Sequence, residues 1–230
     1  MERSLRKVAR TVSGIIEHHV DGHELIEERA MMEALTLYSK NLTTWAKSVS
    51  RKMLETVDKA KARAFYSVSK ELTTGLRGML ADEAVGRRAL ELQEAQVTLI
   101  KSIPIEAGQR AQRLAMEAST GGKRPDEVAQ MLADTEGVTL SRATLIARTE
   151  TSKANSAITQ ARAESVGSKE YFWHTMDDDV VRESHQEMED SGESYSWDTE
   201  PELSDGTSGH PGMFPNCRCF AEPVLSRSEE

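Results

Sequence analysis

The chain has 230 residues, of which 38% are hydrophobic and 29% are charged, and its formal net charge is −9. This length suits one large domain or two small ones, and no apolar run approaches the roughly 18 to 20 residues that a membrane-spanning helix needs. The basic start MERSLRKVAR is not followed by an apolar core, so the sequence predicts no secretory signal.

Charge is distributed unevenly along the chain. Residues 1–103 carry 17 Lys and Arg against 14 Asp and Glu, a net charge of +3, whereas residues 104–230 carry 12 against 24, a net charge of −12. The acidic residues concentrate between Asp177 and Asp205, where Arg182 is the only Lys or Arg. Because an acidic surface repels the phosphate backbone, we expect nucleic-acid contact to be weak or indirect.

The first 103 residues contain no proline and place apolar side chains at three- and four-residue spacing. This pattern predicts three long amphipathic helices, with breaks near residues 20–22, near residues 74–75 and at Ile103–Pro104. Narrow apolar stripes of this kind pack against each other or against a partner subunit. Residues 1–103 are therefore expected to form a partner-docking region, separate from a domain over residues 104–230.

The second half begins with further helices. Residues 105–119 predict one helix, and Pro125 suits the first turn of the next, which Gly137 is expected to close. Thr139 is then expected to cap a helix that ends at Gly167. The segment ARTET, residues 147–151, is the polar centre of that helix.

The pattern changes after Gly167. Residues 170–175 are aromatic and predict a strand, residues 180–188 predict a short helix, and residues 192–215 have the composition of a loop. Residues 219–225 predict a final strand that is expected to pair with the first. The fold class is therefore α+β, with long helices followed by a compact helical domain, a small sheet and a loop that bears Cys and His.

The string HPGMFPNCRC at residues 210–219 holds both cysteines of the chain, Cys217 and Cys219. Thiolates and imidazoles are the ligands that zinc prefers in structural sites, so Cys217, Cys219, His210 and His185 form the candidate zinc-binding set. A metal would supply ordering energy to a loop that buries little apolar surface. Two reduced surface thiols are the alternative interpretation.

These elements, taken in order, resemble the C-terminal domain of phage Mu F-like minor head proteins, also called head-morphogenesis proteins. The resemblance covers about residues 105–225, and it rests on Arg148, Thr149, Glu150, Trp173, Asp178, Arg182, His185, His210, Cys217, Arg218 and Cys219. Many members place the histidine only a few residues before CRC. Here seven positions separate His210 from Cys217, which weakens the expectation that His210 shares a metal with the cysteines.

The resemblance implies a minor structural protein of a phage head, located in the capsid interior at the portal vertex. Its implied partners are the portal protein and the scaffold or capsid proteins, and some family members are thought to leave the head with the DNA. An alternative is a zinc-dependent hydrolase or toxin-like effector delivered with the genome, which would need a zinc position open to water beside Glu150 or Asp178. A DNA-packaging accessory protein is a third option, which the charge distribution disfavours.

Two further interpretations concern the polar residues of the short helix. Asp178 is a candidate for holding the second ring nitrogen of His185. Arg182 is expected to form a structural ion pair with Glu150 or Asp178, tying the short helix to the ARTET helix.

Overall fold

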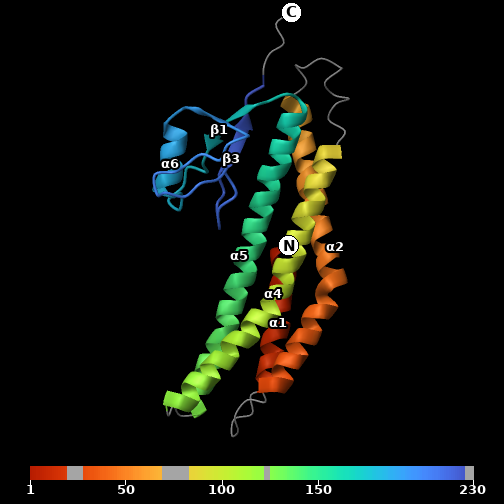
Figure 1. The fold of residues 1–230 in the computed structure, drawn as a ribbon, viewed down its shortest axis with the longest axis vertical. Helices are drawn as coiled ribbons and strands as arrows, with labels where there is room; N and C mark the ends of the chain where they lie inside the picture. The colour runs from red at the N-terminus through yellow and green to blue at the C-terminus, as the bar shows by residue number, and fades with distance from the viewer. Residues whose placement is uncertain (20–27, 69–82, 122–124, 226–230) are drawn as a thin grey trace, which may run out of the picture. The chain divides into compact units, whose positions relative to one another are not determined.

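The computed structural model describes residues 1–19, 28–68, 83–121 and 125–225, and the elements are labelled in Figure 1. The α+β prediction is confirmed, since helices make up most of the described chain and three short antiparallel strands follow them. The elements are α1 (Glu2–His18), α2 (Glu28–Val68), α4 (Glu83–Gly121), α5 (Pro125–Ser165), β1 (Glu170–His174), α6 (Glu183–Asp190), β2 (Ser194–Ser196) and β3 (Phe220–Pro223). None of the helices in the described residues has the length and apolar character needed to span a membrane.

The predicted helix break at Ile103–Pro104 is wrong, because α4 continues through Pro104. A proline inside a helix costs about 3 kcal/mol, since it removes one backbone hydrogen bond. Ile100, Ile103 and Ala107 on either side of it are almost fully buried. The burial of this apolar stripe outweighs the local cost.

The predicted closure at Gly137 is also wrong, because α5 runs unbroken from Pro125 to Ser165. Thr139 therefore does not cap a helix. Its hydroxyl donates to the Thr135 carbonyl 2.7 Å away, one turn back in the same helix. The starting position at Pro125 is confirmed, whereas the breaks expected near residues 20–22 and 74–75 lie outside the described residues.

The chain divides into two compact units, each built from separate stretches of sequence. Unit 1 contains residues 1–51 and 94–147, and unit 2 contains residues 52–93 and 148–230. This division differs from the expected boundary at residues 103 and 104. Helices α2, α4 and α5 each contribute residues to both units.

Unit 1 is a helical core formed by α1 and by parts of α2, α4 and α5. Its apolar side chains recur at helical spacing, and in α1 the buried stripe consists of Leu5, Val8, Val12 and Ile16. Gly108 permits close helix packing, because a Cβ at this position would lie 2.6 Å from the Leu35 side chain. Ser50 and Gln96 add a buried hydrogen bond between side chains of α2 and α4.

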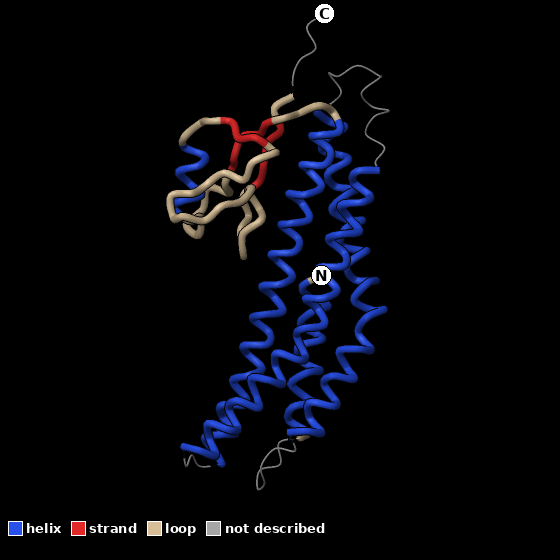
Figure 2. The backbone as a smooth tube through the Cα atoms, viewed as in Figure 1, coloured by secondary structure: helices blue, strands red, loops and turns tan. Residues whose placement is uncertain are grey.

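Unit 2 holds the sheet, in the order β2-β1-β3 with both pairings antiparallel. The expected pairing of the two aromatic strands is confirmed, with Trp173 opposite Ala221 and His174 opposite Phe220. Strand β2 lies in the segment that was expected to be loop throughout. Figure 2 shows that loops and turns make up much of the chain after β1.

Alternation along β1 gives the sheet a buried face. Tyr171 and Trp173 are buried, whereas Phe172 between them is exposed. The core of this unit consists of Ala163, Tyr171, Trp173, Met188, Trp197, Leu203, Cys217, Cys219 and Ala221. Two of the predicted zinc ligands therefore lie in the core and not at the surface.

Candidate metal centre

His185, Cys217 and Cys219 form a compact group of ligand atoms inside unit 2. His185 comes from α6, and the two cysteines come from the segment just before β3. The Nδ1 atom of His185 lies 3.3 Å from the Cys219 sulfur and 3.6 Å from the Cys217 sulfur. All three side chains are buried, and their ligand atoms lie within 4.8 Å of one another. The interpretation of the cysteines as surface thiols is therefore wrong.

The spacing of these atoms fits a tetrahedral metal ion. With zinc–sulfur bonds of about 2.3 Å and zinc–nitrogen bonds of about 2.0 to 2.1 Å, a nitrogen and a sulfur on the same ion are about 3.6 Å apart. The two nitrogen–sulfur distances of 3.3 and 3.6 Å are close to that value. An ion would need only small side-chain movements to reach all three atoms.

The two thiols titrate as a pair. A hydrogen bond from Cys219 lowers the pKa of the Cys217 thiol, although burial opposes this effect. The same contact raises the pKa of the Cys219 thiol, and burial adds to the rise. The first proton therefore leaves the pair more readily than it leaves an ordinary thiol. The thiolate that forms is the species of cysteine that binds metal ions.

The segment that carries the cysteines is held on α5 at the ARTET residues. The backbone N–H of Asn216 donates to the Thr149 hydroxyl 3.1 Å away. Gly212 approaches α5 so closely that a Cβ there would lie 3.2 Å from the Ser152 hydroxyl oxygen. Small and hydroxyl-bearing residues on this part of α5 therefore fix the position of the cysteines.

His210, the fourth predicted ligand, lies outside this group. Its Nδ1 atom is 2.9 Å from the Tyr171 hydroxyl, and its ring packs edge-on against the Tyr171 ring. Burial lowers the pKa of His210 and raises the pKa of Tyr171. Both groups are thus neutral and share one hydrogen bond, so His210 is part of the aromatic core.

Asp178 and Arg182 have partners other than those expected. The Asp178 carboxylate pairs with Arg218 at 2.5 Å, so it does not hold the second ring nitrogen of His185. Arg182 donates to the Pro215 carbonyl at 2.8 Å, which ties the start of α6 to the cysteine segment. The expected link to the ARTET helix is instead supplied by Thr149 and Asn216.

The two charged residues of the ARTET segment differ in burial. Glu150 is 3% exposed and lies 3.5 Å from Lys153, one turn further along α5. Arg148 is exposed. Neither belongs to the group of potential metal ligands found among the described residues.

The part of the chain that carries this centre matches a known protein family. The model of the family described as Phage Mu protein F like protein matches residues 109–222. This part of the chain belongs to the phage Mu protein F like family. The matched range includes β1, β2, most of β3, α6 and all three residues of the candidate metal centre.

A Haemophilus influenzae protein (strain ATCC 51907 / DSM 11121 / KW20 / Rd) that carries the name "Uncharacterized protein" is 33% identical over 213 residues. The aligned residues are 91% of this chain and 46% of that protein. The chain therefore spans about half the length of the curated relative it matches. No solved structure gives a significant match.

Aromatic rings surround His185 in the Mu F-like part. The rings of Phe214 and Trp173 lie 4.9 and 5.5 Å from the His185 ring. The Nε2 atom of His185 and the indole nitrogen of Trp173 are buried without hydrogen-bond partners among the described residues. Trp173 was expected in the motif, but the contact of Phe214 with His185 was not, since only folding brings them together.

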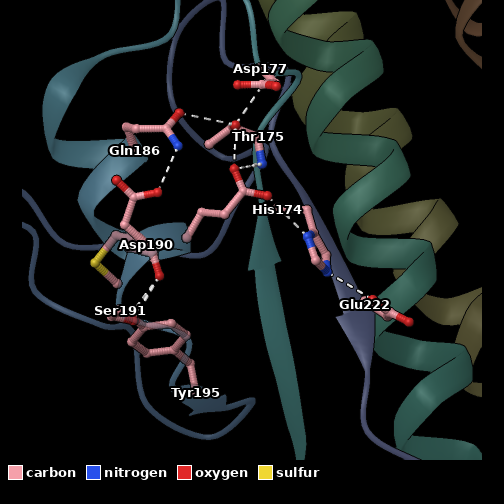
Figure 3. Close-up of polar contacts among 10 residues, drawn as sticks. His174, Thr175, Asp177, Gln186, Asp190, Ser191, Tyr195 and Glu222 are labelled. Carbon is pink, nitrogen blue, oxygen red and sulfur yellow. Dashed lines mark hydrogen bonds and ion pairs between the residues drawn. The ribbon is translucent and has the colours of Figure 1, made fainter.

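A second histidine cluster in the Mu F-like part was not predicted from the sequence. His174 of β1 lies between two carboxylates, with Glu189 of α6 3.1 Å from Nδ1 and Glu222 of β3 2.8 Å from Nε2. Figure 3 shows the contact of His174 with Glu222. Glu189 also accepts a hydrogen bond from Thr175, which is the main cause of its lowered pKa. His174 therefore connects three elements on the side of the sheet opposite the metal group.

Proposed function

We propose that this protein is a minor head protein that acts in the assembly of a tailed-phage head and is located in the virion. The observation that supports this function is the family match over residues 109–222, because it includes β1, β2, most of β3 and the candidate metal centre. We place the protein in the capsid interior at the portal vertex. Its partners are the portal protein and scaffold or capsid proteins, and it leaves the head with the DNA during ejection.

The helices before the Mu F-like part serve to dock the protein on a partner. Opposite its buried stripe, α1 has a face with exposed charged residues, including Lys7 and Arg10. Leu37 of α2 and Leu90 of α4 are 60% and 64% exposed. Apolar side chains at the surface of long helices suit a contact with another subunit.

Zinc has a structural role in this proposal. His185, Cys217 and Cys219 would hold the ion, and a buried S₂N donor set matches its preference for thiolate and imidazole ligands. When bound, the ion would crosslink α6 to the segment before β3. These three residues leave the fourth position of a tetrahedral zinc ion without a protein ligand among the described residues. The carboxylates that hydrolysis would need beside that position are engaged elsewhere, Glu150 by Lys153 and Asp178 by Arg218, and on this ground we favour the structural role.

Metal analysis of purified variants tests this role. We expect about one zinc per wild-type chain, and Cys217→Ser should lose most of it, since two ligands hold the ion far less tightly than three. His210→Gln should keep its zinc, because His210 lies outside the group. A metal-free wild-type chain that takes up no zinc on titration would contradict the proposal.

Purification of heads tests the proposed location. Lysates of the phage that encodes this chain should contain it in portal-bearing heads at a few copies per head. The measurement is quantitative mass spectrometry of heads banded on a density gradient, with a host cytoplasmic protein as the control for trapping. If the chain remains with the host protein in the soluble fraction, it is not a head protein.

A further inference from the structure

The outer face of the sheet in unit 2 carries two exposed aromatic side chains. Phe172 of β1 is 40% exposed and Phe220 of β3 is 44% exposed. The register places Phe172 opposite Glu222 and His174 opposite Phe220, so the two phenylalanines are diagonal neighbours on adjacent strands. Diagonal residues on one face of a sheet are close enough for aromatic side chains to form one surface.

His174, on the same face of the sheet, supports one ring of this pair, that of Phe220. The His174 ring stacks on the Phe220 ring, with centroids 5.2 Å apart and an interplanar angle of 27°. Its two nitrogens are held by Glu189 and Glu222, and Figure 3 shows the contact with Glu222. A preorganised aromatic side chain loses little conformational entropy when a partner binds, which is typical of binding hot spots.

Acidic residues border the aromatic pair. Glu170 and Glu222 lie on the same face of the sheet, and Asp177 and Asp179 are exposed just after β1. The nearby arginines are already engaged, since Arg218 pairs with Asp178 and Arg182 donates to a carbonyl. Lys169, at the entry to β1, is the exception.

Two further apolar side chains are exposed in the segment after β1. Met176 and Val180 are 52% and 75% exposed, and the three aspartates 177–179 lie between them. Carboxylates that stand beside exposed apolar side chains repel phosphate and attract cationic groups. This combination fits a partner segment that presents apolar side chains flanked by Lys and Arg.

We propose that the outer face of the sheet, with Phe172 and Phe220 at its centre and Glu170, Glu222, Asp177 and Asp179 around it, binds a basic, partly apolar segment of another head protein. This inference rests on the proposed head function and adds the surface and the chemistry of the partner. The aromatic rings contribute the affinity. The carboxylates select a cationic partner and make binding sensitive to salt.

Complementation with variants tests the surface. The gene for this chain is inactivated in the phage, and each variant is supplied from a plasmid in the infected cells. Heads are then purified, and incorporation of the variant is measured by mass spectrometry relative to the major capsid protein. Phe172→Ser combined with Phe220→Ser should lower incorporation by at least about tenfold. Val138→Ser is the matched control, since Val138 is 47% exposed on α5, and it should be incorporated as the wild type is.

A second variant tests the charges without altering the sheet. Asp177→Asn combined with Asp179→Asn should lower incorporation by about two- to fivefold, and washing wild-type heads with about 1 M salt should release the protein. Circular dichroism and thermal melting check that each variant folds. Should the double phenylalanine variant fail to fold, the aspartate variant and Phe172→Ser alone decide the question.

Each outcome bears on the proposal in a defined way. Wild-type incorporation of both the phenylalanine and the aspartate variants would overturn the proposed surface while leaving the head function intact. Absence of the wild-type chain from heads would overturn the proposed function, and this inference with it. If sedimentation shows that the purified wild type is a dimer and the phenylalanine variant a monomer, the surface binds a second copy and the basic partner is excluded.

Discussion

The two buried histidines of unit 2 have different surroundings, and these surroundings determine what each can do. His185 faces two sulfur atoms, so a metal ion can bring all three ligand atoms together. His210 faces a tyrosine hydroxyl and the rings of Tyr171 and Trp197, so its imidazole completes a hydrogen bond in the aromatic core. Chemical identity alone does not distinguish them.

The lowered pKa of His210 predicts a pH dependence of stability. Burial disfavours the charged imidazole in the folded state, so the unfolded chain binds more protons as the pH falls through the ordinary value of 6.5. The contribution of His210 to the free energy of unfolding should be complete above about pH 7.5 and should decline as the pH falls below 6.5 towards the lowered pKa. Denaturant unfolding at pH 7.5 and pH 5.5 measures this change.

His210→Gln is the comparison for that measurement, because glutamine still offers an acceptor to the Tyr171 hydroxyl but does not titrate. The wild type should lose more stability than this variant between the two pH values. Other titrating groups are common to both proteins, so the difference reports on His210. Equal losses in both proteins would show that the imidazole is not protected from protonation in the fold.

At the scale of elements, α5 and the cysteine segment depend on each other. The segment before β3 reaches α5 through Asn216 and Gly212, and Arg182 at the start of α6 holds it from the other side. Asn216 and Gly212 both adopt positive φ, at 55° and 86°. These backbone conformations aim Cys217 and Cys219 at His185.

Gly212→Ala tests this contact. A Cβ at residue 212 would meet the Ser152 hydroxyl and the Cys219 carbonyl at 3.2 Å, in addition to the strain of φ +86°. We expect a loss of about 2 to 3 kcal/mol in the free energy of unfolding. Gly206→Ala is the matched control, since Gly206 has φ +78° with no atom within 4 Å, and it should cost about 1 kcal/mol.

Chemical denaturation of both glycine variants measures the two losses. The difference between them isolates the contact with α5, because the backbone strain is similar in both. An equal loss in the two variants would show that the cysteine segment does not depend on close approach to α5.

At the scale of the whole molecule, the acidic charge is the dominant long-range property. The net charge of −9 arises mainly from the half that contains the sheet and the metal centre. At the location that we propose, a protein of this charge is expected to contact other proteins more readily than the packaged DNA. The placement of aromatic side chains among carboxylates on the sheet agrees with a protein partner.

Weak binding to duplex DNA follows from this charge. We expect the full chain to bind with a dissociation constant no tighter than about 10⁻⁴ M at 150 mM salt, which is the weak end of non-specific binding. Fluorescence anisotropy with a labelled 30-base-pair duplex measures it, and a basic DNA-binding protein serves as the positive control. Micromolar binding that weakens steeply with salt would favour the DNA-packaging alternative.

Local sequence patterns were sufficient to predict much of the fold. Apolar spacing predicted the long helices, and the aromatic segments predicted β1, β3 and their pairing. Chemical type alone singled out Cys217, Cys219 and His185, whose ligand atoms the fold brings together. These features depend on the secondary-structure propensity and the apolar periodicity of neighbouring residues, which can be read from the sequence itself.

Tertiary packing decided the remainder. Pro104 and Gly137 interrupt helices by local preference, yet α4 and α5 continue through them because burial of apolar stripes outweighs the local cost. The choice of His185 over His210 as a ligand depended on where α6 and the cysteine segment meet around the sheet. The sequence named both histidines as candidates, with the long gap before Cys217 counting against His210, and only folding brought His185 to the sulfur atoms.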